Sequence, residues 1–353
     1  MAEGAVTIAA MSSLPKSKLL GALVAATALL ALPAAAEATL TYVKNPLHPV
    51  VYAAADNGSG AHKIGSGRSP RVSPDGQLIA YLHEGAGHAQ ELKLVAASGA
   101  GSQTLMVGWQ DTFYLAFSPD STTIAALRGP ELGKRKLVLI DLATGAQRTV
   151  ANGYFSGFSF SPEGDELVYA RAGSESFPPH SDVYRVSASG GKPVRITHDR
   201  RSQDPLWGPG GKIVFVKQLG AKKRKYGPKN ELFLMNPNGS GQKRLTHTKV
   251  GPLVQGLFPT QWSANGKRLL AEFEGQDTSY AVTVDPQTGA QRPLDKVGQQ
   301  GFVGTALSVD GKTVLGFTGG FEPGPSHDVA TVPYGGGRVK PLVKDAFEPD
   351  WSR

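Results

Sequence analysis

Short apolar runs separated by polar turns follow one another along almost the whole chain, and they recur in a fixed order. Each unit starts with a run such as Tyr114–Phe117, and a tight turn leads to a second run such as Thr123–Leu127. A variable loop precedes a third run such as Leu137–Ile140, and a Gly-containing turn precedes a fourth such as Val194–Thr197. Runs of this length, rich in β-branched and aromatic residues, predict four short antiparallel strands in each unit.

The turn between the first and second runs repeats as a phrase. Ser73–Gly76 reads Ser-Pro-Asp-Gly, and looser copies begin at residues 118, 161, 208, 263, 308 and 352. Proline presets φ, aspartate bonds to nearby backbone and glycine accepts a positive φ, so the phrase is typical of a hairpin turn. Consecutive copies lie 43 to 55 residues apart. This period indicates one supersecondary unit repeated along the chain.

Repeated units of four antiparallel strands predict an all-β fold of the β-propeller type. Six complete units run from about residue 67 to residue 344. Residues 39–65 look like a unit that lacks its first strand, and residues 345–353 look like that strand. We therefore expect a seven-bladed β-propeller of four-stranded blades, closed by pairing of the N- and C-terminal strands. The alternative is a six-bladed ring.

The N-terminal segment has a different character. Lys16 and Lys18 precede the apolar run Leu19–Leu32, and small Ala-rich sites follow it, so residues 1–38 are predicted to be a signal peptide. An uncleaved anchor is the alternative, and Met1 or Met11 could be the true start. We expect residues 39–353 to form an extracytoplasmic propeller, periplasmic or secreted, with no membrane span after cleavage.

Composition narrows the chemistry. The 353 residues contain no cysteine, which excludes disulfides, thiol catalysis and cysteine-ligated zinc or iron–sulfur sites. The formal net charge of +8 favours acidic partners. Nucleic acid is not expected, because the protein is predicted to be exported and no basic–aromatic stacking surface is visible. We expect a monomer without a cofactor.

Two segments carry a family resemblance. Ser73–Tyr81 and Leu232–Thr246 resemble the WD40-like repeats of TolB-type propellers, and the likeness extends over residues 39–353. TolB itself has an additional α/β domain before a six-bladed propeller, so the resemblance is to a stand-alone propeller without that domain. It implies an extracytoplasmic binding role. Similar propellers occur in oligogalacturonate lyases and prolyl oligopeptidases, so the fold does not fix the function.

Candidate binding residues gather on one predicted face. The turn phrases lie on one face of a propeller, whereas loops between the second and third strands and between blades lie on the other. Loops on a rigid scaffold often carry function. The candidates on the loop face and at the nearby channel are His83, His180, His198, His247, His327, Arg200, Arg201, Lys222, Lys223, Arg224, Lys225, Asp204 and Glu348. A solvated basic loop at Lys222–Lys225, and a habitual repeat residue at His198 and His247, are the plainer interpretations.

No catalytic or metal-ligating residue is assigned from the sequence. A metal would need three of these side chains within about 2.0–2.1 Å of one ion, and their loops belong to different blades. His83 and His88 do not have the spacing of the helical zinc motif, and Ser326–Asp328 are too close in sequence for a catalytic triad. We expect a non-enzymatic binding or scaffold protein that recognises a protein or an anionic cell-envelope polymer. A polysaccharide- or uronate-active lyase and a metal-dependent hydrolase stay open as alternatives.

Overall fold

The computed structural model describes residues 39–109, 114–130, 133–175, 180–220, 228–249, 256–275, 278–294, 301–319 and 327–352. The predicted signal peptide lies outside these ranges. Strands dominate the described residues, with one short 3-10 turn, η1 (Ala86–His88). Across those ranges, none of the helical structure is both long and apolar enough to cross a membrane.

The strands group into antiparallel sets of four. Over the described ranges, 27 strands make seven such sets, because the long strand β11 serves in two of them. The sets are β27 (Phe347–Trp351) with β1 (Thr39–Lys44), β2 (Val50–Ala55) and β3 (His62–Ser66); β4 (Arg68–Val72), β5 (Leu78–Glu84), β6 (Ala89–Ala96) and β7 (Gln103–Trp109); β8 (Tyr114–Phe117), β9 (Thr123–Arg128), β10 (Arg135–Asp141) and the start of β11 (Gln147–Phe160); the end of β11 with β12 (Glu166–Ala172), β13 (Ser181–Ser187) and β14 (Val194–Arg195); β15 (Ser202–Gly208), β16 (Lys212–Leu219), β17 (Lys229–Met235) and β18 (Lys243–Arg244); β19 (Gly256–Trp262), β20 (Leu269–Glu274), β21 (Ser279–Val284) and β22 (Gln291–Pro293); and β23 (Phe302–Leu307), β24 (Thr313–Thr318), β25 (Val329–Pro333) and β26 (Lys340–Val343).

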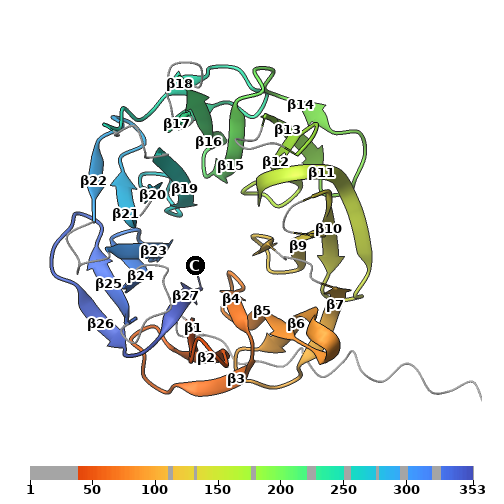
Figure 1. The fold of residues 1–353 in the computed structure, drawn as a ribbon, viewed down its shortest axis with the longest axis vertical. Helices are drawn as coiled ribbons and strands as arrows, with labels where there is room; N and C mark the ends of the chain where they lie inside the picture. The colour runs from red at the N-terminus through yellow and green to blue at the C-terminus, as the bar shows by residue number, and fades with distance from the viewer. Residues whose placement is uncertain are drawn as a thin grey trace, which may run out of the picture. The chain divides into compact units, whose positions relative to one another are not determined.

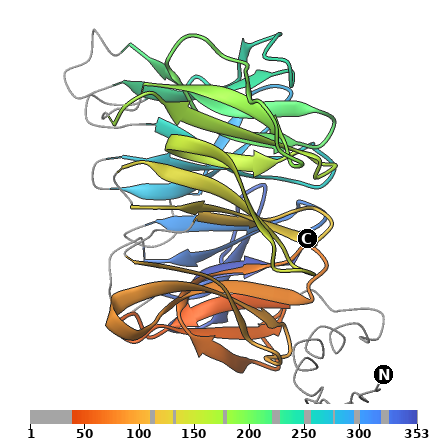
Figure 2. The ribbon, with the colours of Figure 1, turned by 90° about the vertical axis from the view of Figure 1, so that its right-hand side faces the viewer.

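The sets stand side by side around a centre. In Figure 1 the first strand of a set lies nearest the middle, as the labels β4, β15, β19, β23 and β27 show. Seen from the side in Figure 2, the strands run from one face of this ring to the other. The predicted β-propeller fold is therefore confirmed. Residues of the first strand of every set line one cavity, which marks a central channel.

The Ser-Pro-Asp-Gly phrase works as a self-contained hydrogen-bonded turn. The buried Ser73 hydroxyl donates to Asp75 Oδ1 at 2.5 Å and accepts the Leu78 N–H at 2.9 Å. The Gly76 N–H donates to the Ser73 carbonyl oxygen at 2.8 Å, with Gly76 at φ 76°. The same serine arrangement recurs at Ser118, Ser263 and Ser308. Ser161 differs in one respect, because its hydroxyl donates to Asp165, four residues on. The phrase forms the predicted hairpin turn because its bonds are local.

Tryptophans join neighbouring sets. Trp262 and Trp351 end their inner strands, and Trp207 is the last residue but one of β15. All three keep only 8–9% of their surface exposed. The Trp262 indole N–H donates to the Leu206 carbonyl oxygen at 3.2 Å, and that of Trp351 donates to the Leu307 carbonyl oxygen at 2.9 Å. Each of these bonds crosses from one set to the previous one. The tryptophans thus pack between blades, as their equivalent sequence positions predicted.

Two outer strands, β14 and β18, are two residues shorter than the runs Val194–Thr197 and Lys243–Thr246 in the sequence. β14 ends at Arg195, although the apolar run continues to Thr197. The Thr197 hydroxyl accepts the Val183 N–H at 2.9 Å and donates to Asp182 Oδ1 at 3.2 Å. A side chain therefore replaces the next backbone bond of the ladder, and the strand stops.

The two ends of the described chain meet in one sheet. β1 pairs with β27 in the register Leu40 to Trp351, with Thr41 opposite Asp350. The Ser352 N–H donates to the Thr39 carbonyl oxygen at 3.0 Å, and the Thr39 N–H donates to the Ser352 hydroxyl oxygen at 3.0 Å. β27 is thus the inner strand of the set that begins the propeller.

We predict that removing residues 345–353 lowers the melting temperature by roughly 10 °C or more, or causes aggregation. The truncation exposes an edge of β1 and removes the buried Trp351, and losing a tryptophan side chain alone costs about 3–5 kcal/mol. Thermal unfolding followed by circular dichroism measures the effect. Trp351→Phe in the full chain is the control and should cost much less. A truncated chain that melts with the full-length protein would contradict the proposed closure.

Candidate functional site

Three inner strands carry an unusual backbone conformation where they face the channel. Ser69, Asp204 and Glu348 have φ of 52°, 45° and 48°, and each precedes a proline. A left-handed φ at a residue other than glycine costs roughly 1–2 kcal/mol, and proline already restricts the residue before it. In each strand the pairing register shifts at this point, which marks a β-bulge. Such strain often accompanies a functional site.

The bulge in β4 brings two arginines to the same face. Arg68 pairs with Leu82, whereas Arg71 pairs with Ala80, two residues away on β5. In a regular strand, residues three apart face opposite sides. Because the bulge absorbs one residue, Arg68 and Arg71 point to one side.

These arginines line a cavity of about 540 Å³, which we call the channel cavity. Its walls come from four neighbouring sets, whose inner strands are β4, β27, β23 and β19. The residues that line it are Pro46, Pro49, Arg68, Ser69, Arg71, Thr260, Glu272, Val303, Gly304, Thr305, Phe317, His327, Phe347, Glu348 and Pro349. Arg71, Thr260 and Thr305 also line a second cavity of about 580 Å³ beside the turn phrases. The two cavities therefore meet within the channel.

The β4 end of the channel cavity is basic. Both arginines are exposed, and the Arg71 guanidinium donates to the Pro70 carbonyl oxygen at 2.9 Å. Among the described residues, neither arginine forms an ion pair with a carboxylate. Glu348 also lines this end, but its Oε2 accepts the Ser69 N–H at 2.6 Å. Among the residues that line this end, two guanidinium groups therefore face one engaged carboxylate. Two further carboxylates nearby are also engaged: Asp350 accepts the Val72 N–H at 2.9 Å, and the pKa of Glu84 is lowered first by its hydrogen bond with His88 and then by charges that include Arg68.

The β20 end is acidic and poorly solvated. Glu272 lines the cavity and accepts a hydrogen bond from the Ser279 hydroxyl. Burial raises the pKa of Glu272 to about 7, with the charge of Glu274 adding to the effect. Burial also raises the pKa of Glu274. These carboxyl groups lie on one side of β20, because they are two residues apart.

Asp204 extends this acidic arc to β15. Its side chain keeps some contact with solvent, but it lies deep within the ring. Burial, and then repulsion from Glu274, raise the pKa of Asp204 to about 8. A side chain on Gly157 of β11 would place its Cβ 2.8 Å from Asp204 Oδ1, so glycine is required there for the carboxylate to fit. The carboxyl group accepts no hydrogen bond from the described part of the chain.

His327 is fixed beside the cavity. Its side chain is 8% exposed and lies between the rings of Phe317 and Phe347, at centroid distances of 5.9 and 6.2 Å. His327 Nδ1 lies 3.0 Å from the Thr318 carbonyl oxygen. Because a carbonyl oxygen only accepts, Nδ1 carries the proton.

The other predicted histidines are spread over the loop face. His180, His198 and His247 are exposed, and His83 Nδ1 lies 2.8 Å from the Ser66 carbonyl oxygen. In the ranges that the structure covers, no group of three histidine, aspartate or glutamate side chains is arranged to hold a metal ion. Of the predicted residues, His327 and Glu348 line the channel cavity, whereas these four histidines do not.

The basic candidates divide in a similar way. Arg200 and Arg201 are exposed, and their N–H groups donate to Asp182 Oδ1 at 2.9 Å and to Asp199 Oδ1 at 3.0 Å. These bonds fix the loop before β15 and leave the guanidinium groups at the surface. Lys222, Lys223, Arg224 and Lys225 lie outside the described residues.

A repeated acid–threonine contact precedes the histidines that follow two of the fourth strands. Fully buried Glu231 accepts hydrogen bonds from Thr246 at 2.5 Å and Arg244 at 3.1 Å. Asp182 makes the equivalent contacts with Thr197 and Arg195. The Arg-x-Thr triplet therefore holds the third and fourth strands together, and the following histidine lies at the surface.

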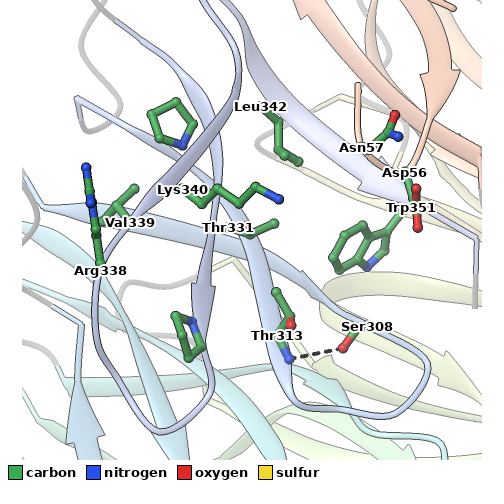
Figure 3. Close-up of a pocket in the computed structure, with 12 residues that line it drawn as sticks. Asp56, Asn57, Ser308, Thr313, Thr331, Arg338, Val339, Lys340, Leu342 and Trp351 are labelled. Carbon is green, nitrogen blue, oxygen red and sulfur yellow. Dashed lines mark hydrogen bonds between the residues drawn. The ribbon is translucent and has the colours of Figure 1, made fainter. Parts of the chain in front are cut away.

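A larger cavity of about 730 Å³ lies at the seam between two blades, beside the turns (Figure 3). Lys340 reaches across this seam cavity, while Arg338 stands at its edge and Trp351 forms part of its wall (Figure 3). Asp56 and Asn57 lie on the other side, in the turn after β2. The seam cavity lies between the outer hairpins of two adjacent blades. Arg338 and Lys340 line it and carry the same charge as the two channel arginines.

Sequence reasoning missed Arg71, Glu272 and Glu274. The available signal was the pair of acids alternating with a phenylalanine in Ala271–Glu274, at the end of a second strand. Strand alternation predicts that these two acids share a face of the strand. Only the arrangement of the blades in the ring shows that this face borders the channel cavity.

We predict that Asp204→Asn stabilises the protein more at pH 8 than at pH 5, by about 2 kcal/mol or roughly 5 °C. The pKa of Asp204 is about 8 in the folded protein, above its unfolded value, so stability falls as pH rises from about 4 towards 8. Asparagine removes this loss and tolerates the left-handed backbone. Differential scanning calorimetry at several pH values tests the expectation.

The matched control is Glu348→Gln at the equivalent bulge. Its carboxylate accepts the Ser69 N–H, so the substitution weakens a charge-assisted bond and should not stabilise. A parallel change in both variants, or none at Asp204, would contradict the assigned burial.

Comparison with known proteins places this geometry in a wide structural class. No family model and no curated protein matches the sequence. TolB from Acinetobacter baumannii matches with a TM-score of 0.56 and 16% identity, over 89% of this chain and 82% of that one. An oligogalacturonate lyase in complex with manganese matches with a TM-score of 0.58 and 15% identity, over 88% and 85%. The β-propeller domain of the Trilobed protease from Pyrococcus furiosus matches with a TM-score of 0.62 and 15% identity, over 87% and 92%.

Identities this low establish the fold alone. The predicted resemblance to TolB-type propellers is confirmed at that level. The chain is a β-propeller, the architecture that it shares with these proteins.

Proposed function

We propose that this protein is an exported, non-enzymatic propeller that binds an anionic ligand in the channel cavity. The ligand is an acidic group of a protein or of a cell-envelope polymer. One observation carries the proposal: Arg68 and Arg71 project from one bulged strand into a cavity, and no described carboxylate pairs with either. The predicted signal peptide at residues 1–38 supports export.

The chemistry of the arginines suits a carboxylate or another planar anion. A guanidinium group offers several N–H donors in a fixed fork, which binds carboxylates in a bidentate way. Thr260 of β19 and Thr305 of β23 also line the cavity, and the Thr305 hydroxyl donates to the Leu315 carbonyl oxygen at 3.5 Å. At about 540 Å³ the cavity has the size of an ordinary small-ligand site, so it would admit one unit or one end of a larger acidic partner.

Affinity for acidic polymers tests the proposal. We expect polygalacturonate and poly-glutamate to bind the full chain at low salt and to bind Arg68→Gln/Arg71→Gln at least tenfold more weakly, or about 1.4 kcal/mol. The double variant should also show a smaller dependence of affinity on salt, because it loses two screened contacts. Isothermal titration calorimetry at two salt concentrations measures both effects.

Arg338→Gln/Lys340→Gln at the seam cavity removes the same net charge and serves as the control. It should retain most of the affinity. Equal weakening in the two double variants would show that only the net charge of the protein matters. Unchanged affinity in the channel variant would show that the polymers do not bind in the channel cavity.

A further inference from the structure

We propose that the channel cavity selects a zwitterionic ligand, a peptide of two or three residues with both ends free. Arg68 and Arg71 hold its carboxylate, and Glu272 holds its ammonium group. The inference rests on the proposed function, which requires only the anionic contact.

The two charged ends of the cavity are held apart by the ring. The arginines lie on β4, and Glu272 lies on β20. The blades of β27 and β23 stand between the blades that carry these strands. The opposite charges therefore line one cavity without neutralising each other, and among the described residues no ion pair joins them.

The stretch between the charged ends is mostly apolar. Phe317, Phe347 and Val303 line it, and the imidazole of His327 lies between the two phenylalanine rings. A peptide fits this order of surfaces, because it carries a carboxylate at one end, an ammonium group at the other and apolar groups between them. A ligand with two carboxylates would place one of them against Glu272.

Glu272 has a free position for a cation. The Ser279 hydroxyl holds Oε1, which leaves Oε2 for the ligand. Burial raises the pKa of Glu272, the hydrogen bond from Ser279 lowers it and the charge of Glu274 raises it further. None of these causes is a cation, within the part of the chain that the structure describes. A ligand ammonium group supplies that missing partner and favours the ionised carboxylate.

A random tripeptide library tests the inference, with its N-acetylated and C-amidated counterparts as matched probes. We expect the full-length protein to retain tripeptides with free ends, measured by mass spectrometry after rapid gel filtration. For the best-retained sequence, calorimetry should show at least tenfold weaker binding after either modification.

Two variants assign the ends. Glu272→Gln should weaken binding of the free tripeptide about tenfold and leave the N-acetylated form unchanged. Arg68→Gln/Arg71→Gln should weaken the free form and leave the C-amidated form unchanged. Glu163→Gln, an exposed acid in a turn phrase on the opposite face, should bind like the parent protein. Neutral glutamine suits the buried position of Glu272, so this variant is expected to fold.

The outcomes separate the two proposals. If N-acetylated tripeptides bind as tightly as free ones, or if no tripeptide is retained while polygalacturonate still binds through the arginines, the zwitterionic ligand is overturned and the anionic site stands. If neither peptides nor polyanions depend on Arg68 and Arg71, both proposals fail.

Discussion

Ring closure is the constraint on which the rest of this structure depends. A single four-stranded sheet of such short strands has too small a core to be stable alone, so each blade needs apolar neighbours on both sides. The pairing of Leu40 with Trp351 supplies the last of these contacts. The same strand, β27, also carries Glu348 and Asp350, whose carboxylates accept hydrogen bonds from the Ser69 and Val72 N–H groups of β4. Closing the ring therefore builds part of the channel wall as well.

The bulges of the inner strands turn this wall into a site. Proline at the bulge removes a backbone donor, and the preceding residue takes a left-handed φ, as at Ser69, Asp204 and Glu348. A regular strand would avoid this cost. It would also place Arg68 and Arg71 on opposite faces, and only one would reach the cavity. The local strain and the pair of cations thus have the same structural origin.

The sequence allowed the fold to be predicted further than the site. The Ser73–Gly76 turn depends on hydrogen bonds between residues at most five apart, so the turn can be predicted from the sequence without tertiary structure. The channel cavity joins Arg71 with Glu272, which are about 200 residues apart and belong to blades that are not neighbours. No local sequence pattern indicates that residues so far apart in the chain line the same cavity. The repeat pattern also favoured the histidines that follow Arg-x-Thr as candidates. In the structure the threonine of this triplet holds two strands together, and the histidine lies at the surface.

The charges in the channel are difficult to explain by stability alone. Opposite charges that lay next to each other could pair and lower the cost of burial. Here the ring keeps the acids of β15 and β20 on one arc and the arginines of β4 on another, so burial raises the pKa values of Asp204 and Glu272. Replacing Asp204 or Glu272 by a neutral residue would remove the free-energy cost of burying its carboxylate, so a protein without a functional constraint would be expected to lose these acids. A ligand that carries both charges satisfies the two arcs at once, which is why separation of charge, more than net charge, indicates the chemistry of the ligand.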